Sequence, residues 1–214
     1  MPAPRTAPTI VTLCAVAFLT FQPAPASAAE AGFAMVFPQD PVVTTYVDSW
    51  GFARSGGRRH EGTDLMAPKM TPVYSAADGV VTSVDEGGSA GRRLVIDHGG
   101  GWETWYLHLN NDTPGTDDGR ADWSDTLAEG IEAGAAVTAG QLVAFVGDSG
   151  NAEWTGAHTH LELHREGTAI NPYPSLLAAQ EVAFAEMADD VVPRVADLVR
   201  SLGRTTGRLL GPYD

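Results

Sequence analysis

The sequence predicts a mainly β fold in which two antiparallel sheets pack together with a cleft between them, followed by a helical tail. Short segments with β-branched or alternating residues are separated by glycine and proline at close spacing, which is typical of antiparallel strands rather than of β–α–β units. The sequence contains no internal repeat. The expected strands are Val42–Val47, Gly79–Asp85, Arg93–His98, Glu103–Leu109, Leu142–Val146 and Thr159–His164.

The helical tail is predicted from a change of spacing after Asn171-Pro-Tyr-Pro174. Ser175 is in position to cap a helix, and Pro193 is expected to end or restart it. We expect residues 175–214 to pack back on the domain, with docking of a partner as the alternative. The apolar residues at helical spacing include Leu176, Leu177, Phe184, Met187, Val195, Leu198, Val199 and Leu202.

The first 28 residues have the organisation of an export signal. Arg5 precedes an apolar run from Thr9 to Phe21, which is too short to span a bilayer stably, and Ala26-Ser-Ala28 fits the small-residue cleavage rule. We therefore expect residues 1–28 to be removed and the secreted chain to start at Ala29, without membrane insertion. The only cysteine, Cys14, would be lost, so the exported chain must depend on its core, a metal or both.

The formal net charge is −14, and it becomes −15 without Arg5 because residues 1–28 contain no acidic side chain. So acidic a chain should not bind nucleic acid or anionic membranes non-specifically. No basic patch is evident in the sequence. Any recognition of an anionic partner must then come from the cleft itself.

An acidic segment, residues 110–134, interrupts the strand pattern. It lacks the alternating ligands and central glycine of an EF-hand, so a solvated loop is favoured over a calcium loop. We expect Thr113–Ala128 to be a surface loop at the cleft rim that can be shortened. Against one base, Arg120, the segment contains Asp112, Asp117, Asp118, Asp122, Asp125 and Glu129.

Three short motifs together indicate a metal site: His60-Glu-Gly-Thr-Asp64, Tyr106-Leu-His108-Leu and His158-Thr-His160. Catalytic zinc usually takes three protein ligands and leaves a fourth position for water. In a strand, residues two apart face the same way, so spacing alone does not choose between His158 and His160. Gly62 permits a tight backbone path between His60 and Asp64.

The ordered set of motifs resembles the LytM/lysostaphin-type zinc endopeptidases, which cut peptide bridges in bacterial cell walls. The matching pieces run in family order from about Val36 to Pro174, which implies a LytM-like domain over residues 29–174. They are Gly57-Arg-Arg-His60-Glu-Gly-Thr-Asp64-Leu-Met-Ala-Pro68, Thr71-Pro-Val-Tyr-Ser-Ala76, Asp78-Gly-Val-Val81, Ile96-Asp-His-Gly99, Tyr106-Leu-His-Leu109, Ala139-Gly-Gln-Leu142 and Gly156-Ala-His-Thr-His-Leu-Glu162.

The resemblance implies a Zn²⁺ ion held by His60, Asp64 and His160, with proton transfer by His108 and His158. It implies a secreted or wall-associated endopeptidase that acts on the peptides of peptidoglycan, with a zinc-bound water as nucleophile. The sequence does not indicate which bond is cut. A glycine bridge, a cross-link between stem peptides and a peptide outside the wall are all possible substrates.

Three further side chains near these motifs keep two interpretations each, and a fourth, His164, keeps one. Tyr106 is either an oxyanion donor or a rim aromatic, and Glu162 either orients a ligand imidazole or is a strand-end charge. His98 is interpreted as structural or substrate-lining. His164 extends the face of His158 and His160 but is not expected to be essential.

Two other functions compete with this prediction. A non-catalytic LytM-like regulator of other wall hydrolases would be expected to lack ligands, and none is missing; the departures at Ala157, Thr159, Leu161 and Lys69-Met70 touch none of the five site positions. A serine hydrolase is suggested by Gly147-Asp-Ser149-Gly150, but a turn of this composition also precedes the His-x-His strand of the zinc family. The turn is favoured.

Overall fold

The computed structural model describes residues 32–209, with side chains described to Leu198 and again at Arg200. The predicted signal peptide, the cleavage site before Ala29 and Cys14 lie outside the described residues. So do the side chains of Val199 and Leu202 in the predicted tail. The domain boundaries at 28 and 174 therefore remain predictions.

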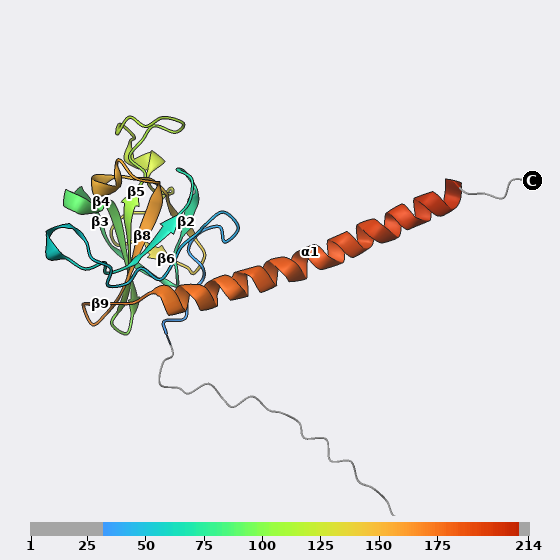
Figure 1. Cartoon of the computed structure of the whole chain (residues 1–214), viewed down its shortest axis with the longest axis horizontal. Helices are drawn as coiled ribbons and strands as arrows, with labels where there is room; N and C mark the ends of the chain where they lie inside the picture. The colour runs from blue at the N-terminus through green and yellow to red at the C-terminus, as the bar shows by residue number, and fades with distance from the viewer. Residues whose placement is uncertain (1–31, 210–214) are drawn as a thin grey trace, which may run out of the picture. The chain divides into compact units, whose positions relative to one another are not determined.

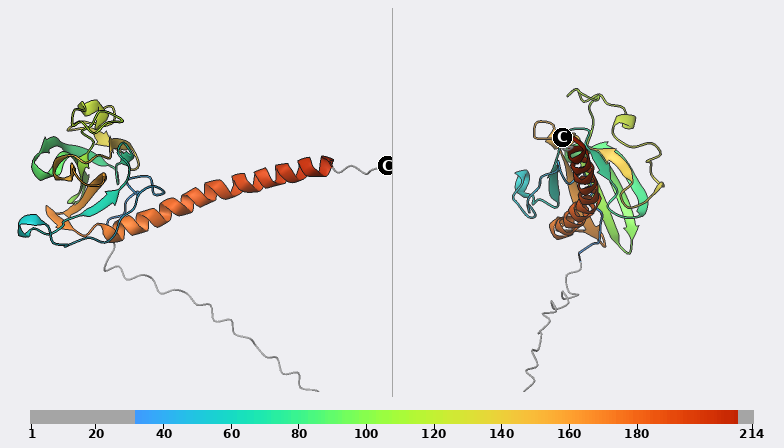
Figure 2. Two further views of the ribbon diagram at one scale, coloured as in Figure 1. Left: turned by 45° about the horizontal axis from the view of Figure 1, so that its top comes forward. Right: turned by 90° about the vertical axis from the view of Figure 1, so that its right-hand side faces the viewer.

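The described strands form a seven-stranded sheet and a two-stranded sheet (Figure 1). The large sheet has the order β1-β8-β5-β4-β3-β6, with β9 paired to β8, and every pair is antiparallel. The views of Figure 2 show its long strands side by side. The strands are β1 Thr63–Met66, β2 Pro72–Tyr74, β3 Gly79–Gly87, β4 Gly91–Gly99, β5 Trp102–Leu109, β6 Ala136–Val137, β7 Leu142–Phe145, β8 His158–Arg165 and β9 Thr168–Ile170.

The predicted mainly antiparallel β fold is confirmed, and five of the six expected segments contain a strand. The sixth, Val42–Val47, is wrong: it makes a single bridge, between Thr45 and Met66. Its valines have the composition of a strand, but Val42, Val43 and Val47 are exposed and the segment has no ladder to extend. β-branched residues favour a strand only where neighbouring side chains cover them.

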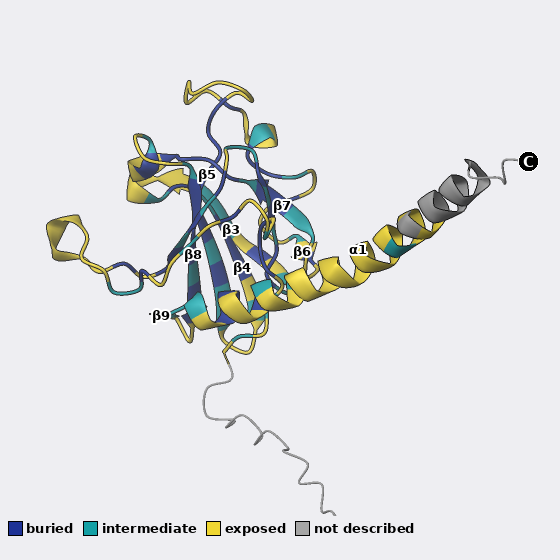
Figure 3. Cartoon of the chain, turned by 45° about the vertical axis from the view of Figure 1, so that its right-hand side comes forward, coloured by how far each residue is buried: buried dark blue, intermediate teal, exposed yellow. Residues whose placement is uncertain are grey.

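The expectation of a cleft between the two sheets is wrong, because the core fills the space between the large sheet and the β2–β7 pair. The cleft lies instead beside β1, β5 and β8 of the large sheet. Leu94, Ile96 and Tyr106 of the large sheet and Val73 and Val143 of the small sheet are fully buried in one cluster. Figure 3 shows β4, β5 and β8 of the large sheet in dark blue over much of their length. This packing holds β1, β5 and β8 as a rigid frame for the side chains on the opposite face.

The tail is one helix, α1 Tyr173–Leu209, which begins two residues before the predicted start. Asn171 replaces Ser175 as the capping residue, since its Oδ1 accepts a hydrogen bond of 3.0 Å from the Tyr173 N–H, whereas Ser175 is buried inside the helix. Leu176 and Ala179 pack into the core. Within the part of the chain that the structure describes, no helix is long and apolar enough to cross a membrane.

The helix also continues through Pro193, so the prediction that this residue would end or restart it is wrong. Proline removes one hydrogen bond to the carbonyl four residues earlier. That residue, Asp189, is exposed, so water can satisfy its carbonyl.

The acidic segment is only partly the surface loop that was expected. Residues 113–120 are continuously exposed, but Ala121, Thr126 and Leu127 are buried. The guanidinium of Arg92 donates to the Ala121 carbonyl at 2.7 Å and to Thr126 Oγ1, which ties the second half of the segment to the sheet. The expectation that all of Thr113–Ala128 is a surface loop is therefore wrong beyond residue 120.

Candidate metal centre

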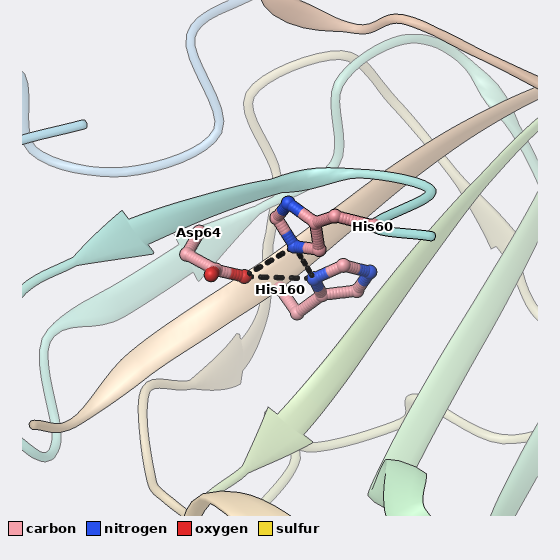
Figure 4. Close-up of side chains that lie close together, drawn as sticks. All are labelled: His60, Asp64 and His160. Carbon is pink, nitrogen blue, oxygen red and sulfur yellow. Dashed lines mark hydrogen bonds and ion pairs between the residues drawn. The ribbon is translucent and has the colours of Figure 1, made fainter. Parts of the chain in front are cut away.

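Three side chains on neighbouring strands meet at one point (Figure 4). His60 lies just before β1, Asp64 lies in β1, and His160 lies opposite Asp64 in β8. His60 Nε2 is 3.0 Å from Asp64 Oδ1 and 2.9 Å from His160 Nδ1, and the last two atoms are 2.8 Å apart. The two histidines are buried.

The outer hydrogen bonds of these rings decide which nitrogen carries a lone pair. His60 Nδ1 must donate to the Ser49 carbonyl, at 3.0 Å, so Nε2 is the free acceptor of the neutral ring. His160 Nε2 faces Glu162 Oε1 at 3.2 Å, which leaves Nδ1 as its acceptor. Two imidazole lone pairs and a carboxylate oxygen thus converge. This donor set fits a zinc ion, which relieves their mutual repulsion.

Both carboxylates of the centre stay ionised, as a metal site requires. Burial alone would raise the pKa of Asp64, but hydrogen bonds with His160 and His60 hold it well below its usual range. For Glu162 burial also acts upward, and contacts with His160 and His164 overcome it and lower the pKa to about 2. The second oxygen of Asp64, Oδ2, accepts a hydrogen bond of 2.8 Å from Arg54.

A second pair of histidines lies beside the three donors. The rings of His108 and His158 are 5.0 Å apart, and His158 Nε2 is 3.9 Å from Asp64 Oδ1. His108 Nδ1 donates to the Ser149 carbonyl at 2.9 Å, and His158 Nδ1 donates to the Gly156 carbonyl at 2.7 Å. In the neutral rings each Nε2 is then free to accept a proton. Burial, with His158 close by, lowers the pKa of His108 to about 4, so this ring is neutral at pH 7.

His108 reaches this place through an irregularity in β5. Arg92 and Leu94 of β4 are two positions apart, but they pair with Leu109 and Tyr106, which are three apart. This extra residue is a β-bulge, and His108 adopts a φ of 60° within it. A regular strand would turn His108 to the same side as Tyr106, whereas the bulge turns it into the cleft with Leu107.

The bulge also decides the role of Tyr106. Its side chain is fully buried in the core, and its hydroxyl accepts hydrogen bonds from the Ala76 N–H at 2.8 Å and from Thr104 Oγ1 at 3.1 Å. Tyr106 is therefore neither the oxyanion donor nor the rim aromatic that the sequence suggested. The assumption of a regular strand caused the error.

Ser149 has a structural role, which removes the serine-hydrolase alternative. Its hydroxyl donates to the Leu109 carbonyl at 2.7 Å and accepts from the Arg92 N–H at 2.9 Å. Its contact with His108 is through the backbone carbonyl, so no described histidine takes the hydroxyl proton. Ser149 instead positions the end of β5 and the ring of His108.

His98 lies apart from the centre. Its two ring nitrogens contact the Asp78 carbonyl and Thr104 Oγ1, which supports the structural interpretation. His164, by contrast, extends the centre: its Nε2 is 2.7 Å from Glu162 Oε2, and its ring stacks on Trp105 at 4.3 Å. The alternation along the sequence placed His164 on this face but gave no sign of the link through Glu162.

Gly62 is required by the close approach of His160. A Cβ at this position would lie 2.6 Å from His160 Nε2 and 2.5 Å from the Leu161 carbonyl oxygen.

The carbonyls of Ser49 and Ser149 that orient His60 and His108 are backbone groups, so no residue type in the sequence could indicate them.

The centre lies in a cleft of about 550 Å³. Among its lining residues are His60, Asp64, His108, His158 and His160, so the structure brings all five predicted site residues together. None of the lining residues comes from segment 110–134, so the expectation that this loop forms the cleft rim is wrong.

Comparisons with known proteins agree with this geometry. Residues 58–119 match the profile of Peptidase family M23. The chain is 34% identical to the peptidoglycan DD-endopeptidase ShyA of Vibrio cholerae over 136 residues, which cover 63% of this chain and 27% of the relative. The chain spans 30% or less of the length of the first curated relatives that it matches.

Two solved structures show the same domain. A LytM protein from Ruminococcus gnavus is 35% identical and superposes with a TM-score of 0.55, covering 68% of this chain and 60% of that one. A zinc-containing peptidase from Vibrio cholerae is 29% identical with a TM-score of 0.51, covering 64% of this chain and 39% of that one. This chain therefore carries a LytM-type domain of peptidase family M23.

Proposed function

We propose that this protein is an exported zinc metalloendopeptidase that hydrolyses peptide bonds in peptidoglycan. One observation carries the proposal: three lone-pair donors, His60, Asp64 and His160, converge within 3.0 Å of one another beside two histidines whose Nε2 atoms are free. The peptidoglycan assignment is supported by the relative ShyA, which is named for that substrate.

The residues divide into two roles. His60, Asp64 and His160 hold the metal, and the ion supplies Lewis-acid chemistry that makes water nucleophilic near neutral pH. His108 and His158 move protons. One neutral Nε2 accepts the proton of the attacking water, and a protonated ring delivers it to the leaving amine nitrogen.

The surroundings keep these two proton carriers in place. Because each Nδ1–H is held by a backbone carbonyl, each ring presents the same nitrogen to the substrate. The lowered pKa of His108 keeps it a neutral base, and its burial excludes bulk water from that side of the reaction. His158 Nε2 lies 3.9 Å from Asp64 Oδ1, so this ring is close to the three converging donors.

Export from the cell is a separate part of the proposal and is supported by the predicted signal segment. Residues 1–28 combine Arg5, an apolar run and a small-residue cleavage site. Loss of Cys14 with that segment would leave a chain without a thiol, which suits an oxidising compartment. Purification from the medium and sequencing of the first residues would test cleavage before Ala29.

Digestion of purified sacculi tests the activity. We expect the protein, purified after any processing by the cell that produces it, to contain about one zinc per chain. It should release peptide fragments from sacculi, and the masses of these fragments identify the bond that is cut. A chelator should stop the release, and added zinc should restore it. Zinc-free protein that digests sacculi in the presence of chelator would contradict the metal proposal.

The same experiment separates the regulatory alternative. A folded, zinc-loaded protein that releases nothing from sacculi alone, but increases release by another wall hydrolase, would indicate a LytM-like activator. An inactive variant such as His158→Ala serves as the control, because a regulator would keep its effect when a proton carrier is removed.

A further inference from the structure

The mouth of the cleft carries a group of arginines, which is unusual in so acidic a chain. Arg54, Arg58 and Arg59 all line the cleft that contains the metal centre. They are three of only 13 lysines and arginines against 27 acidic residues. The short stretch before β1 therefore places three arginines and one acidic residue, Glu61, at the cleft, where the sequence alone had indicated no basic patch.

Two of these arginines have no carboxylate partner. Arg54 is paired with Asp64. Arg58 contacts only the Ser55 carbonyl through Nε, and Arg59 contacts only the Gly51 carbonyl through one terminal nitrogen. Both side chains are exposed, and neither forms an ion pair within the described residues.

Most of the other described cations do form ion pairs. Lys69, Arg92 and Arg93 each form an ion pair with at least one carboxylate. Arg194 and Arg200 pair along α1. Arg120 and Arg165 also form no ion pair within the described residues, but Arg165 lies over the Trp102 ring and neither residue lines the cleft. Arg58 and Arg59 are therefore the two described cations that line the cleft without a carboxylate partner.

We propose that Arg58 and Arg59 bind a free carboxylate of the peptide substrate. A guanidinium presents parallel N–H donors that match the two oxygens of a carboxylate, and the backbone bonds leave most of these donors available. The local positive charge also offsets the repulsion between an anionic peptide and a chain of net charge −14. The inference rests on the proposed peptidase function and specifies its substrate: a peptide with an ionised carboxylate near the cut bond, rather than an uncharged bridge.

Paired substrates test this proposal directly. A soluble cross-linked muropeptide fraction is compared with the same fraction after its free carboxyls are converted to primary amides, which have nearly the same shape but no charge. We expect the kcat/KM of the wild-type enzyme to be about tenfold higher for the carboxylate form than for the amide form. Hydrogen bonds from the arginines to a charged carboxylate give this preference, and exposure to solvent limits its size. The preference should reside mainly in KM and should shrink as salt is added.

Single variants identify the residues responsible. Arg58→Gln and Arg59→Gln should each lower the preference for the carboxylate form without lowering zinc content or cleavage of the amide form. Arg58→Lys and Arg59→Lys should retain part of it, because the charge remains. Arg120→Gln is the matched control: it removes the same charge from an exposed site outside the cleft lining and should leave the preference unchanged.

The outcomes separate this proposal from the one on which it rests. Zinc-loaded wild type that cuts neither fraction would contradict the peptidase function itself. Wild type that cuts both fractions equally, or glutamine variants that keep the full preference, would contradict carboxylate binding and leave the peptidase function standing. An equal change in Arg120→Gln would show that net charge, and not this site, is responsible.

Discussion

Strands β8 and β5 both deliver histidines to the cleft, but they do so in opposite ways. β8 is regular against β1 and β5, so His158, His160, Glu162 and His164 alternate onto one face. β5 ends in a bulge, and His108 reaches the same cleft only through a left-handed backbone. A regular strand places every second side chain on one face and so can supply several site residues. A site residue on the neighbouring strand that must approach them out of this alternation needs a local irregularity such as a bulge.

The largest effect should follow from removing a donor of the metal. His60→Ala, Asp64→Ala and His160→Ala each delete one of three converging atoms, so we expect loss of zinc, loss of sacculus digestion and lower thermal stability, because metal binding contributes folding free energy. Metal analysis and a thermal melt with and without zinc would check this. His98→Ala, which alters a histidine outside the cleft, is the control.

Variants within β8 also test the choice between its two leading histidines. If His158→Ala lost zinc while His160→Ala kept it, the two roles proposed for this strand would be exchanged.

The next largest effect compares the two strands directly. His108→Ala on β5 and His158→Ala on β8 remove proton carriers and leave the three donors intact, so zinc should stay bound. Each general acid or base contributes typically ~10²–10⁴-fold in rate, and we expect a fall in kcat/KM of that order for each variant. Full activity in both variants would refute the proton-transfer roles even with zinc present.

This contrast also explains what the sequence could predict. The period-two spacing of β8 predicted correctly that His158, His160, Glu162 and His164 share a face. The same rule failed on β5, because a bulge is decided by pairing with β4 and by the Ser149 hydroxyl, neither of which is visible near Tyr106 and His108 in the sequence.

Other errors have the same origin in partners distant along the chain. The acidic segment was interpreted as a solvated loop from its charge, but Arg92 from β4 and Lys69 from the turn before β2 bind its backbone and side chains. The order of the motifs was sufficient to predict the antiparallel fold and the cluster of five site residues. It was not sufficient to predict that Arg58 and Arg59 form no ion pair within the described residues, because this depends on where every carboxylate lies.

A smaller effect is expected from the residue that orients His160. Glu162→Gln keeps the shape but removes the charge that accepts from His160 and His164, and outer partners of this kind typically contribute ~10–100-fold in metal affinity. Zinc affinity measured by competition with a chelator would check it. His164→Ala should have a weaker effect in the same direction, and an unchanged affinity in Glu162→Gln would contradict the orienting role.

The acidic segment offers a smaller test that contrasts its exposed and anchored halves. Shortening residues 114–119 removes one partner of Lys69, Asp117, but keeps the buried partners Asp112 and Asp148. We expect zinc content to be unchanged and the free energy of unfolding to fall by less than about 1 kcal/mol, as for an exposed ion pair. A matched deletion that includes Ala121 and Thr126 should prevent folding, because it removes the anchors of Arg92.

The smallest effect is expected at a second of the three described non-glycine positions with positive φ, Met70. Met70, like His108, is a non-glycine residue with positive φ, 66°, but it lies outside the cleft lining. Met70→Gly should relieve the strain of a left-handed backbone, and the greater freedom of glycine in the unfolded chain offsets part of the gain, so we expect stabilisation of about 0.5–1 kcal/mol with unchanged kcat/KM. His108→Gly relieves the same kind of strain but also deletes a buried side chain and its hydrogen bond to Ser149, so any gain in stability should be smaller than for Met70→Gly, and activity should fall. Chemical denaturation and sacculus digestion measured on both variants would show whether the strain at His108 is maintained for function; equal loss of stability in the two would contradict this.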